Sequence, residues 1–159
     1  MADYNFVTVW HIEAPLHDVC AAIQHVVCWP QWWQGVERIE ALQTGDHSGV
    51  GSVLRCTWKS RMAYRLTFDV RITRVEPLLL VEGVASGELE GVGCWRFSRH
   101  GAVTVVRYDW RVRTTRRWMN LLAPVARTLF RWNHDALMRA GAHGLARMLG
   151  ARLLGITQR

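Results

Sequence analysis

The sequence lacks the long apolar segments that mark membrane proteins and secreted precursors. Its 159 residues contain no apolar run near the roughly 20 residues that span a bilayer. The N-terminal stretch MADYNFVTVWHIEAP has no basic region followed by an apolar core, which a secretory signal would need. We therefore expect one soluble, cytoplasmic domain over residues 1–159.

Short motifs of common catalytic and cofactor sites are also missing. The chain has no G-x-S-x-G, no H-E-x-x-H, no Walker loop and no G-x-G-x-x-G that opens a helix. The four cysteines form neither a C-x-x-C pair nor a zinc spacing, and no two of the seven histidines stand four residues apart. We therefore name no catalytic residue, no metal ligand and no cofactor, and whether the protein is an enzyme stays open.

Lysine is nearly absent, so the positive charge comes almost entirely from arginine. Lys59 is the only lysine, the formal net charge is +7, and from Arg111 onward ten arginines face a single acid, Asp135. We interpret this asymmetry first as a solvated face and expect no nucleic acid partner. A weak contact of the arginine-rich C-terminal helix with anionic membranes stays open as an alternative.

The patterns that are present predict an order of elements. YNFVTVWHIEA alternates with period two, which predicts a first strand, and PLHDVCAAIQHVV and CWPQWWQGV predict two short helices. From Val36 to Thr114, turn signals separate six runs of strand periodicity, most simply an antiparallel meander. Residues 116–150 predict a long helix that covers one face of this sheet, with a kink or a fresh start at Pro124.

Three stretches within this order carry a resemblance to a known family: IEAPLHDVCAAIQHVVCWPQWWQGV, GELEGVGCWRF and WNHDALMRAGAHGL. They resemble the START-like (SRPBCC) superfamily, and within it the bacterial polyketide cyclase/dehydrase and lipid-transport type proteins. The resemblance implies an α+β helix-grip fold, in which a curved antiparallel sheet of about seven strands wraps around a long C-terminal helix, with two short helices between strands 1 and 2. It also implies a cavity between sheet and helix for a hydrophobic small molecule such as a lipid, polyketide, quinone or plant hormone.

Strand parity, independently of the resemblance, predicts which side chains face the covered side of the sheet. The inward set is strongly aromatic, while the alternate positions carry charges of both signs. These rings either pack solid or enclose an apolar pocket with a few polar groups. We predict a ligand-binding pocket lined by Trp58, Tyr64, Phe68, Trp95, Tyr108, Trp110 and Asn133.

The stretch RWNHDALMRAG places three polar residues in succession inside the predicted helix. At about 100° per residue, Asn133 falls near a buried stripe centred on Leu129, whereas His134 and Asp135 fall roughly 120–140° away on opposite flanks. The three cannot converge as a triad or a metal site, so we expect His134 and Asp135 on the surface. Asn133 should face inward and bond either to the protein or to a ligand.

The function that this pattern favours is the binding or transport of a hydrophobic small molecule. The alternative is a polyketide cyclase/dehydratase-type enzyme, in which Tyr64, Tyr108 and Asn133 would orient the substrate and stabilise an enolate in the same cavity. No clear acid is found on the inward positions. Glu82 and Glu88 lie on a strand of ambiguous parity, so whether either faces the cavity stays open.

Overall fold

The computed structural model describes residues 3–61, 64–121 and 123–159, the side chains of residues 118, 119 and 123 excepted. Strands make up about half of the chain, with short helices after the first strand and a long helix near the end. In chain order the elements are β1 (Asp3–Glu13), α1 (Leu16–Gln24), η1 (Val26–Cys28), α2 (Trp29–Trp32), β2 (Val36–Gln43), β3 (Val53–Lys59), β4 (Arg65–Glu76), β5 (Leu80–Gly87), β6 (Leu89–His100), β7 (Val103–Thr114), α3 (Arg117–Leu121), α4 (Ala123–Leu149) and β8 (Arg152–Gln158).

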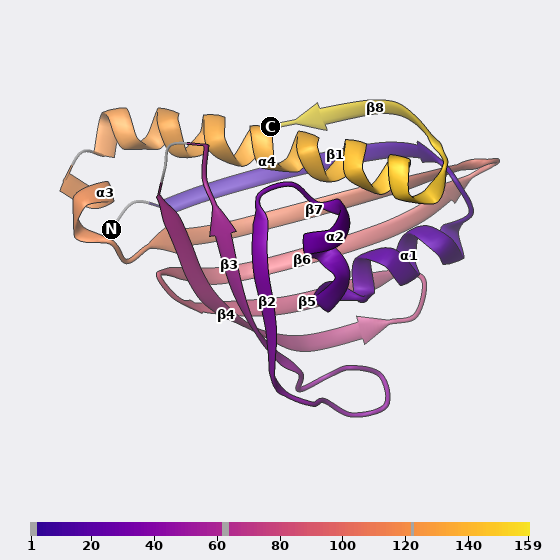
Figure 1. Cartoon of the computed structure of the whole chain (residues 1–159), viewed down its shortest axis with the longest axis horizontal. Coiled ribbons are helices and arrows are strands. Elements are labelled where there is room, and N and C mark those ends of the chain that lie inside the picture. Colours follow the sequence, from indigo (N-terminus) through magenta and orange to yellow (C-terminus); the bar gives the residue numbers. More distant parts are fainter. Residues whose placement is uncertain (1–2, 62–63, 122) are drawn as a thin grey trace.

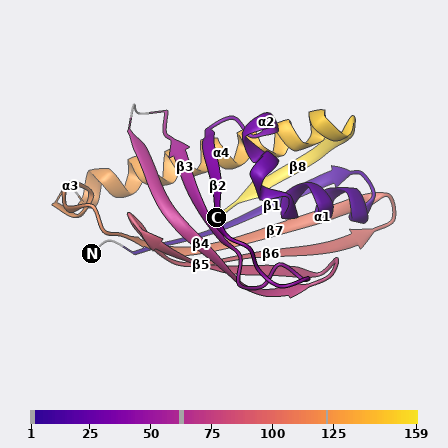
Figure 2. The same ribbon diagram turned by 60° about the horizontal axis from the view of Figure 1, so that its bottom comes forward.

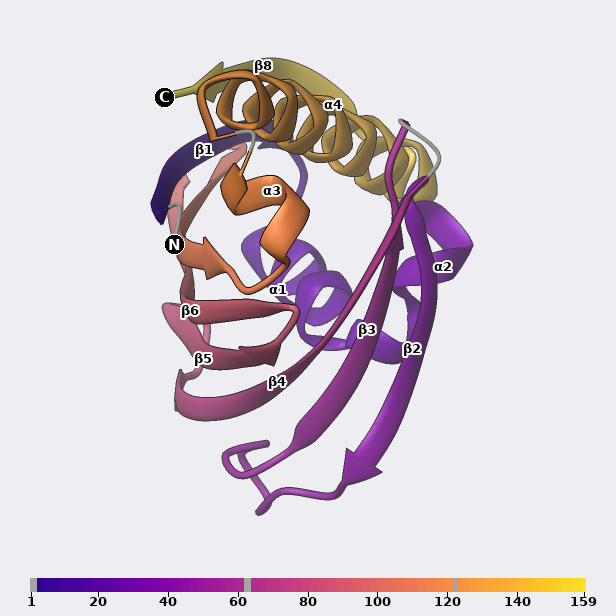
Figure 3. The ribbon, with the colours of Figure 1, turned by 90° about the vertical axis from the view of Figure 1, so that its left-hand side faces the viewer.

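The strands form one antiparallel sheet in the order β2-β3-β4-β5-β6-β7-β1-β8. Strands β2 to β7 are the six-stranded meander that the sequence predicts, and β1 pairs with β7 along ten residue pairs. The sheet curves strongly, and its concave face holds α1 and α2 and partly encloses α4 (Figures 1 and 3). The predicted α+β helix-grip fold is therefore confirmed.

The C-terminal strand β8 is the one sheet element that the sequence analysis missed. Helix α4 ends at Leu149, where Gly150 adopts φ of +61° and the Ala151 N–H donates to the Ala146 carbonyl at 2.8 Å. This pattern, with a left-handed glycine after the last helical turn, reverses the chain. The chain then returns along β1, and β8 also lies beside α4 (Figure 2), so the sheet has eight strands rather than about seven.

Proline 124 begins a new helix, as the sequence predicts. Helix α3 ends at Leu121 and the 27-residue helix α4 begins at Ala123, which puts Pro124 in the first turn. A first-turn residue has no intrahelical acceptor for its N–H, so the missing donor of proline costs nothing there. None of the helices in the described ranges is long and apolar enough to cross a membrane.

The buried face of α4 differs from the predicted one. Leu129 and Val125 are exposed, whereas Ala126 and Phe130 are buried, so the stripe is centred closer to Phe130 than to Leu129. The prediction placed the largest apolar residues inward, but the face that meets the core is built mainly from small residues, because the helix approaches its neighbours closely. Asn133 lies near both stripes and is buried as expected.

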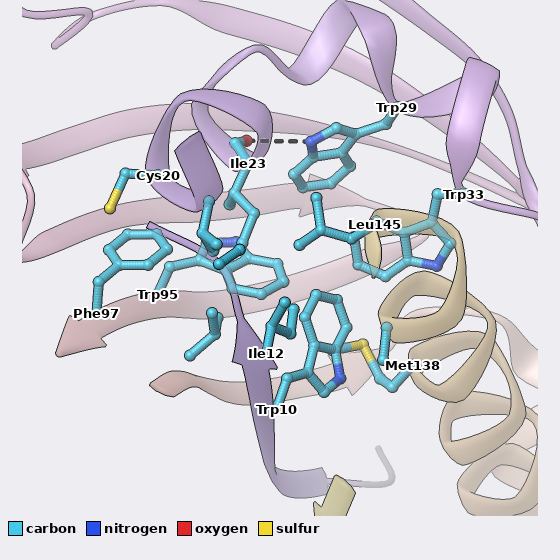
Figure 4. Packing of buried hydrophobic residues seen from close by; sticks show 14 of the residues in the cluster. Trp10, Ile12, Cys20, Ile23, Trp29, Trp33, Trp95, Phe97, Met138 and Leu145 are labelled. Carbon is cyan, nitrogen blue, oxygen red and sulfur yellow. Dashed lines mark hydrogen bonds between the residues drawn. The ribbon is translucent and has the colours of Figure 1, made fainter. Parts of the chain in front are cut away.

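Two clusters of buried side chains form the core. The first joins α1, α2, the strands around β1 and the second half of α4, and it includes Trp10, Trp33 and Leu145, which are almost fully buried (Figure 4). The second lies nearer to α3 and the start of α4 and includes Phe6 and Phe130. The side chains between the clusters surround the cavities described next.

Candidate functional site

An apolar cavity of about 300 Å³ lies between the sheet and the segment that joins α1 to α2. Strands β3 to β7 supply one wall, and Ile23, Val26 and Trp29 supply the other. Val27 and Ser48, which also line it, are exposed, so this end of the cavity meets solvent beside the loop that joins β2 and β3.

A second, smaller cavity of about 80 Å³ lies under the first half of α4. Phe130, Asn133 and Leu137 reach it from the helix, and Ser60 and Tyr64 reach it from the segment between β3 and β4. The two cavities share part of their walls, so together they run from the loop between β2 and β3 to the underside of α4. The shared lining residues are Trp29, Trp58, Phe68, Trp95, Tyr108 and Trp110.

The structure brings the predicted site residues together around these cavities. Trp58, Phe68, Trp95, Tyr108 and Trp110 line both, whereas Tyr64 and Asn133 line only the smaller one. That any of them contacts a ligand stays a prediction.

The position of the larger cavity differs from the expectation, because no residue of α4 lines it. The reason is that α2 places Trp33 directly against the helix. The Trp33 Nε1 donates to the Leu137 carbonyl at 2.8 Å, and the ring packs against the backbone of Gly141. The space under the helix is therefore largely filled, and the main cavity lies beside α2 instead.

Aromatic rings on neighbouring strands form a continuous stack along the shared wall. Trp95 and Tyr108 are direct partners in the β6–β7 register, and their ring centroids lie 4.0 Å apart with planes 20° from parallel. The Tyr108 ring also stacks on Trp110 at 5.8 Å. Offset stacks of this kind are stable, and they present flat apolar faces to which another flat ring can bind.

Two glycines in adjacent strands leave room for the larger cavity. Gly83 and Gly93 are partners in the β5–β6 register, and both line it. A Cβ at Gly93 would come 2.8 Å from the Trp110 ring and 2.9 Å from the Tyr108 hydroxyl oxygen, closer than real contacts allow. Glycine inside a strand is otherwise unfavourable, so at this position it allows the large rings to lie close to the backbone.

Neither cavity is lined by an Asp, Glu, Lys or Arg side chain of the described residues. Burial raises the pKa of the Tyr64 and Tyr108 phenols, and it raises the pKa of the Cys56 thiol to about 12. All three groups are therefore neutral near pH 7. Because an unpaired charge is costly to bury, such a lining suits a neutral ligand.

The two acids whose orientation the sequence left open lie outside both cavities. The Glu88 carboxylate accepts from the Thr67 backbone N–H at 2.6 Å and pairs with Arg116 at 2.5 Å, which ties β4 to the segment before α3. Glu82 lines neither cavity. A carboxylate base in the cavities is therefore not available from the described residues.

Besides the indoles, the polar side chains that line the cavities are those of Gln24, His25, Ser48, Ser52, Ser60, Tyr64, Tyr108, Asn133 and His134. The Trp58 Nε1 is buried and has no hydrogen-bond partner among the described residues, and its side chain lines both cavities. The Asn133 Oδ1 accepts from the Arg61 backbone N–H at 3.1 Å, so part of this amide has a structural role. Trp58 and His134 are thus cavity-lining residues whose buried ring nitrogens have no hydrogen-bond partner among the described residues.

His134 was expected on the surface, and this prediction is wrong. Its side chain is 11% exposed, its ring stacks on Phe6 at 4.0 Å, and it lines the smaller cavity. Burial lowers the pKa of His134, while Asp135, 3.6 Å from Nδ1, acts in the opposite direction. The error follows from the helix phase, since centring the stripe on Leu129 turned His134 outward. Asp135 lines neither cavity, so the tripeptide forms no triad.

Trp29 is a cavity residue that the sequence analysis placed in a short helix and did not include in the predicted site. It lines both cavities, and its Nε1 donates to the Ile23 carbonyl at 3.0 Å, which fixes the ring over the cavity wall. The density of Trp in CWPQWWQ was the available signal. No group of three or more His, Cys, Asp or Glu side chains that could hold a metal occurs within the described ranges.

Comparison with solved structures identifies proteins with the same fold. The di-domain ARO/CYC BexL from the BE-7585A biosynthetic pathway matches with a TM-score of 0.75 and 18% identity over 94% of this chain, which spans 51% of that protein. The Zhui aromatase/cyclase from Streptomyces sp. R1128 matches with a TM-score of 0.72 and 14% identity, covering 94% of each chain.

A START superfamily protein from Mycobacterium smegmatis matches with a TM-score of 0.74 and 11% identity over 91% of this chain and 99% of that one. No family model and no curated protein matches by sequence. At these identities the likeness establishes the helix-grip fold that START-like proteins share.

Proposed function

We propose that this protein binds a neutral hydrophobic small molecule, such as a quinone, a lipid or a polyketide-like compound, in the cavity beside α2. The observation that carries the proposal is an apolar space of about 300 Å³ with aromatic walls and, among the described residues, no Asp, Glu, Lys or Arg in its lining. Ligand pockets are commonly apolar concavities of about 300–1,000 Å³ with few polar groups. The volume suits a fused-ring molecule or a single chain better than a two-chain lipid.

The aromatic stack and the indole of Trp58 give this site two ways to select a ligand. Trp95, Tyr108 and Trp110 offer flat surfaces for a conjugated ring system. The Trp58 Nε1 is a buried donor without a partner in the described protein, and leaving such a group unsatisfied costs about 1–3 kcal/mol. A ligand whose carbonyl oxygen accepts from it is therefore favoured over a hydrocarbon of the same shape.

The first experiment is native mass spectrometry of the protein purified from its own host without detergent, followed by titration of tryptophan fluorescence with a quinone. A copurified hydrophobic molecule and a saturable fluorescence change are the expected results. If no small molecule copurifies and no quinone, lipid or polyketide-like compound changes the fluorescence saturably, the proposal is wrong.

A pair of conservative variants tests the role of the indole donor. Trp58→Phe removes the N–H and keeps an aromatic ring, so the affinity for a quinone should fall about tenfold, while that for a hydrocarbon probe stays nearly unchanged. Trp32→Phe is the matched control, because Trp32 lines neither cavity. Equal quinone affinities in the two variants would rule out the hydrogen bond.

A cyclase/dehydratase-type activity in the same cavity is the second candidate, favoured by the two aromatase/cyclase structures of the same fold. Tyr64, Tyr108 and Asn133 would then orient a poly-ketone, with the two neutral phenols donating to its developing enolate oxygen. Turnover of a supplied linear poly-ketone that is lost in Tyr108→Phe supports the enzyme. Saturable binding of the same compound without any product supports the carrier.

A further inference from the structure

The imidazole of His134 is buried under α4 and has no hydrogen-bond partner among the described residues. Both ring nitrogens are buried and unpaired. The ring stacks on Phe6 with the two planes 11° apart, which holds it in place, and it lines the smaller cavity. A buried polar group without a partner costs free energy, so its presence in a native fold points to a partner outside the chain, such as a ligand or a water.

The surroundings of His134 favour a neutral ring with its bare nitrogen at Nε2. Burial lowers the pKa of His134 and the charge of Arg131 acts in the same direction, whereas Asp135 acts in the opposite one. A neutral imidazole has one N–H donor and one bare nitrogen that accepts. The Asp135 Oδ1 lies 3.6 Å from Nδ1, and a carboxylate favours the proton on the nitrogen that it faces. Nε2 is therefore a buried acceptor.

Other polar groups of the smaller cavity are already engaged within the protein. The Asn133 Oδ1 accepts from the Arg61 backbone N–H at 3.1 Å, and the Tyr64 side chain hydrogen-bonds to that of Ser60. In the described part of the chain, the buried Nε1 of Trp58 and the ring nitrogens of His134 lack such partners. The smaller cavity therefore offers a ligand one donor, at Trp58, and one acceptor, at His134.

We infer that the ligand carries a hydroxyl group that enters the smaller cavity and donates to the Nε2 of His134. The inference rests on the proposed function and narrows its ligand class. A hydroxyl also accepts hydrogen bonds, so it suits the Trp58 donor as well. A ketone or an ether oxygen only accepts and leaves His134 unpaired. The site therefore selects a hydroxylated ring system over the ketone or ether of the same skeleton.

The sizes of the two cavities fix how such a ligand lies. The smaller cavity, of about 80 Å³, has room for a hydroxyl but not for a fused-ring system, which fits the larger cavity of about 300 Å³. All residues that line the smaller cavity are buried or half-buried, whereas the larger one meets solvent at Val27 and Ser48. The hydroxyl therefore points inward, toward α4, and the apolar end of the ligand lies nearer to the opening.

The test is calorimetric titration of the full chain with three compounds of one skeleton: naphthalene, 2-methoxynaphthalene and 2-naphthol. The methoxy compound keeps the acceptor oxygen and lacks the donor. We expect 2-naphthol to bind about tenfold more tightly than 2-methoxynaphthalene, because only 2-naphthol pairs the buried acceptor of His134. In nitrogen NMR of the native protein, the resonance of the bare His134 nitrogen should shift with 2-naphthol and stay in place with 2-methoxynaphthalene.

Three histidine variants separate the hydrogen bond from the shape of the cavity. His134→Phe keeps a ring on Phe6 and removes the acceptor, so the preference for 2-naphthol over 2-methoxynaphthalene should disappear. His134→Gln supplies an amide oxygen as acceptor and should restore part of the preference. His143→Phe is the matched control, because His143 is exposed on α4 and lines neither cavity. Thermal melting of each variant confirms that it is folded.

The outcomes distinguish this inference from the proposed function on which it rests. If the native protein binds 2-naphthol and 2-methoxynaphthalene equally well, or if folded His134→Phe keeps the preference, the inference is wrong and the proposed function stands. An unchanged His134 nitrogen resonance in the presence of bound 2-naphthol overturns it in the same way and needs no variant. If none of the three compounds binds saturably, the proposed function fails, and the inference fails with it.

Discussion

The two halves of α4 meet the rest of the molecule in different ways. In the C-terminal half, Gly141 and Gly144 bring the helix backbone against Trp33 and Trp32, and neither position has room for a Cβ. In the N-terminal half, bulky side chains separate the helix from the sheet, and the smaller cavity lies beneath them. A helix held tightly at one end can therefore leave space for a ligand at the other without losing its position.

We expect the largest loss of stability from removing the Trp33 ring, against which the C-terminal half of α4 packs. Trp33 is 1% exposed, so Trp33→Ala should lower the free energy of unfolding by about 3–5 kcal/mol, as large-to-small core changes do. Trp58 is only partly buried and faces the cavities, so Trp58→Ala should cost clearly less. Urea unfolding measures the free energy of unfolding of both variants. Equal decreases would show that the region around Trp33 is not packed more tightly than the region around Trp58.

A glycine substitution tests the close approach itself. In Gly144→Ala the new Cβ would collide with the Trp32 carbonyl, and overpacking should destabilise the fold by about 1–3 kcal/mol even though alanine favours the helix. Gly155→Ala is the control, because a Cβ there meets no atom within 4 Å and the backbone is not left-handed. If calorimetry gives the two variants the same melting temperature, the C-terminal half of α4 does not pack tightly against Trp32.

The third prediction concerns the amide over the smaller cavity. Asn133→Ala removes the acceptor of the Arg61 N–H, so the free energy of unfolding should fall by about 1 kcal/mol. Asn5→Ala, at an exposed position of β1, should change it little. A variant as stable as the native protein but weaker in ligand affinity would show that Asn133 acts mainly on the ligand.

The smallest effect is expected for the change of stability with pH that arises from His134. Burial depresses the pKa of His134 in the folded state below its ordinary value of 6.5, so the unfolded chain binds the proton more readily. The stability from the neutral ring is fully present above about pH 6.5 and declines as the pH falls toward the lowered pKa. His134→Phe, which keeps a ring on Phe6, should flatten this part of the curve of urea midpoint against pH, whereas exposed His143→Phe should not.

Local periodicity was sufficient to predict the aromatic strand residues that line both cavities. The strand residues Trp58, Phe68, Trp95, Tyr108 and Trp110 alternate with charged or polar neighbours, and a strand turns successive side chains to opposite faces. Their inward orientation followed from that rule alone. The six-strand meander followed from the turn signals between the strands. The rule could not predict the size of the cavity that these rings face.

The helix phase was predicted less well, because both sides of α4 carry apolar residues. Leu129 and Trp132 lie outward and Phe130 inward, so hydrophobicity alone pointed to the wrong stripe and left His134 on the surface. The strand β8 was missed for a related reason, since its residues continue the apolar pattern of the helix and only Gly150 marks the change. In both cases the residue pattern was compatible with two different structures.

The sequence by itself determined the order of the strands up to β7, the long helix after them, the α+β class and the aromatic character of the inner face, because these depend on residue spacing within single segments. The tertiary structure decided where the space lies. Trp33, which directly follows α2, is more than a hundred residues from its partner Leu137 in the chain; it fills the region under the helix, and the larger cavity lies beside α2 instead. Such a contact depends on how separate elements fit together, and local periodicity carries no information about that fit.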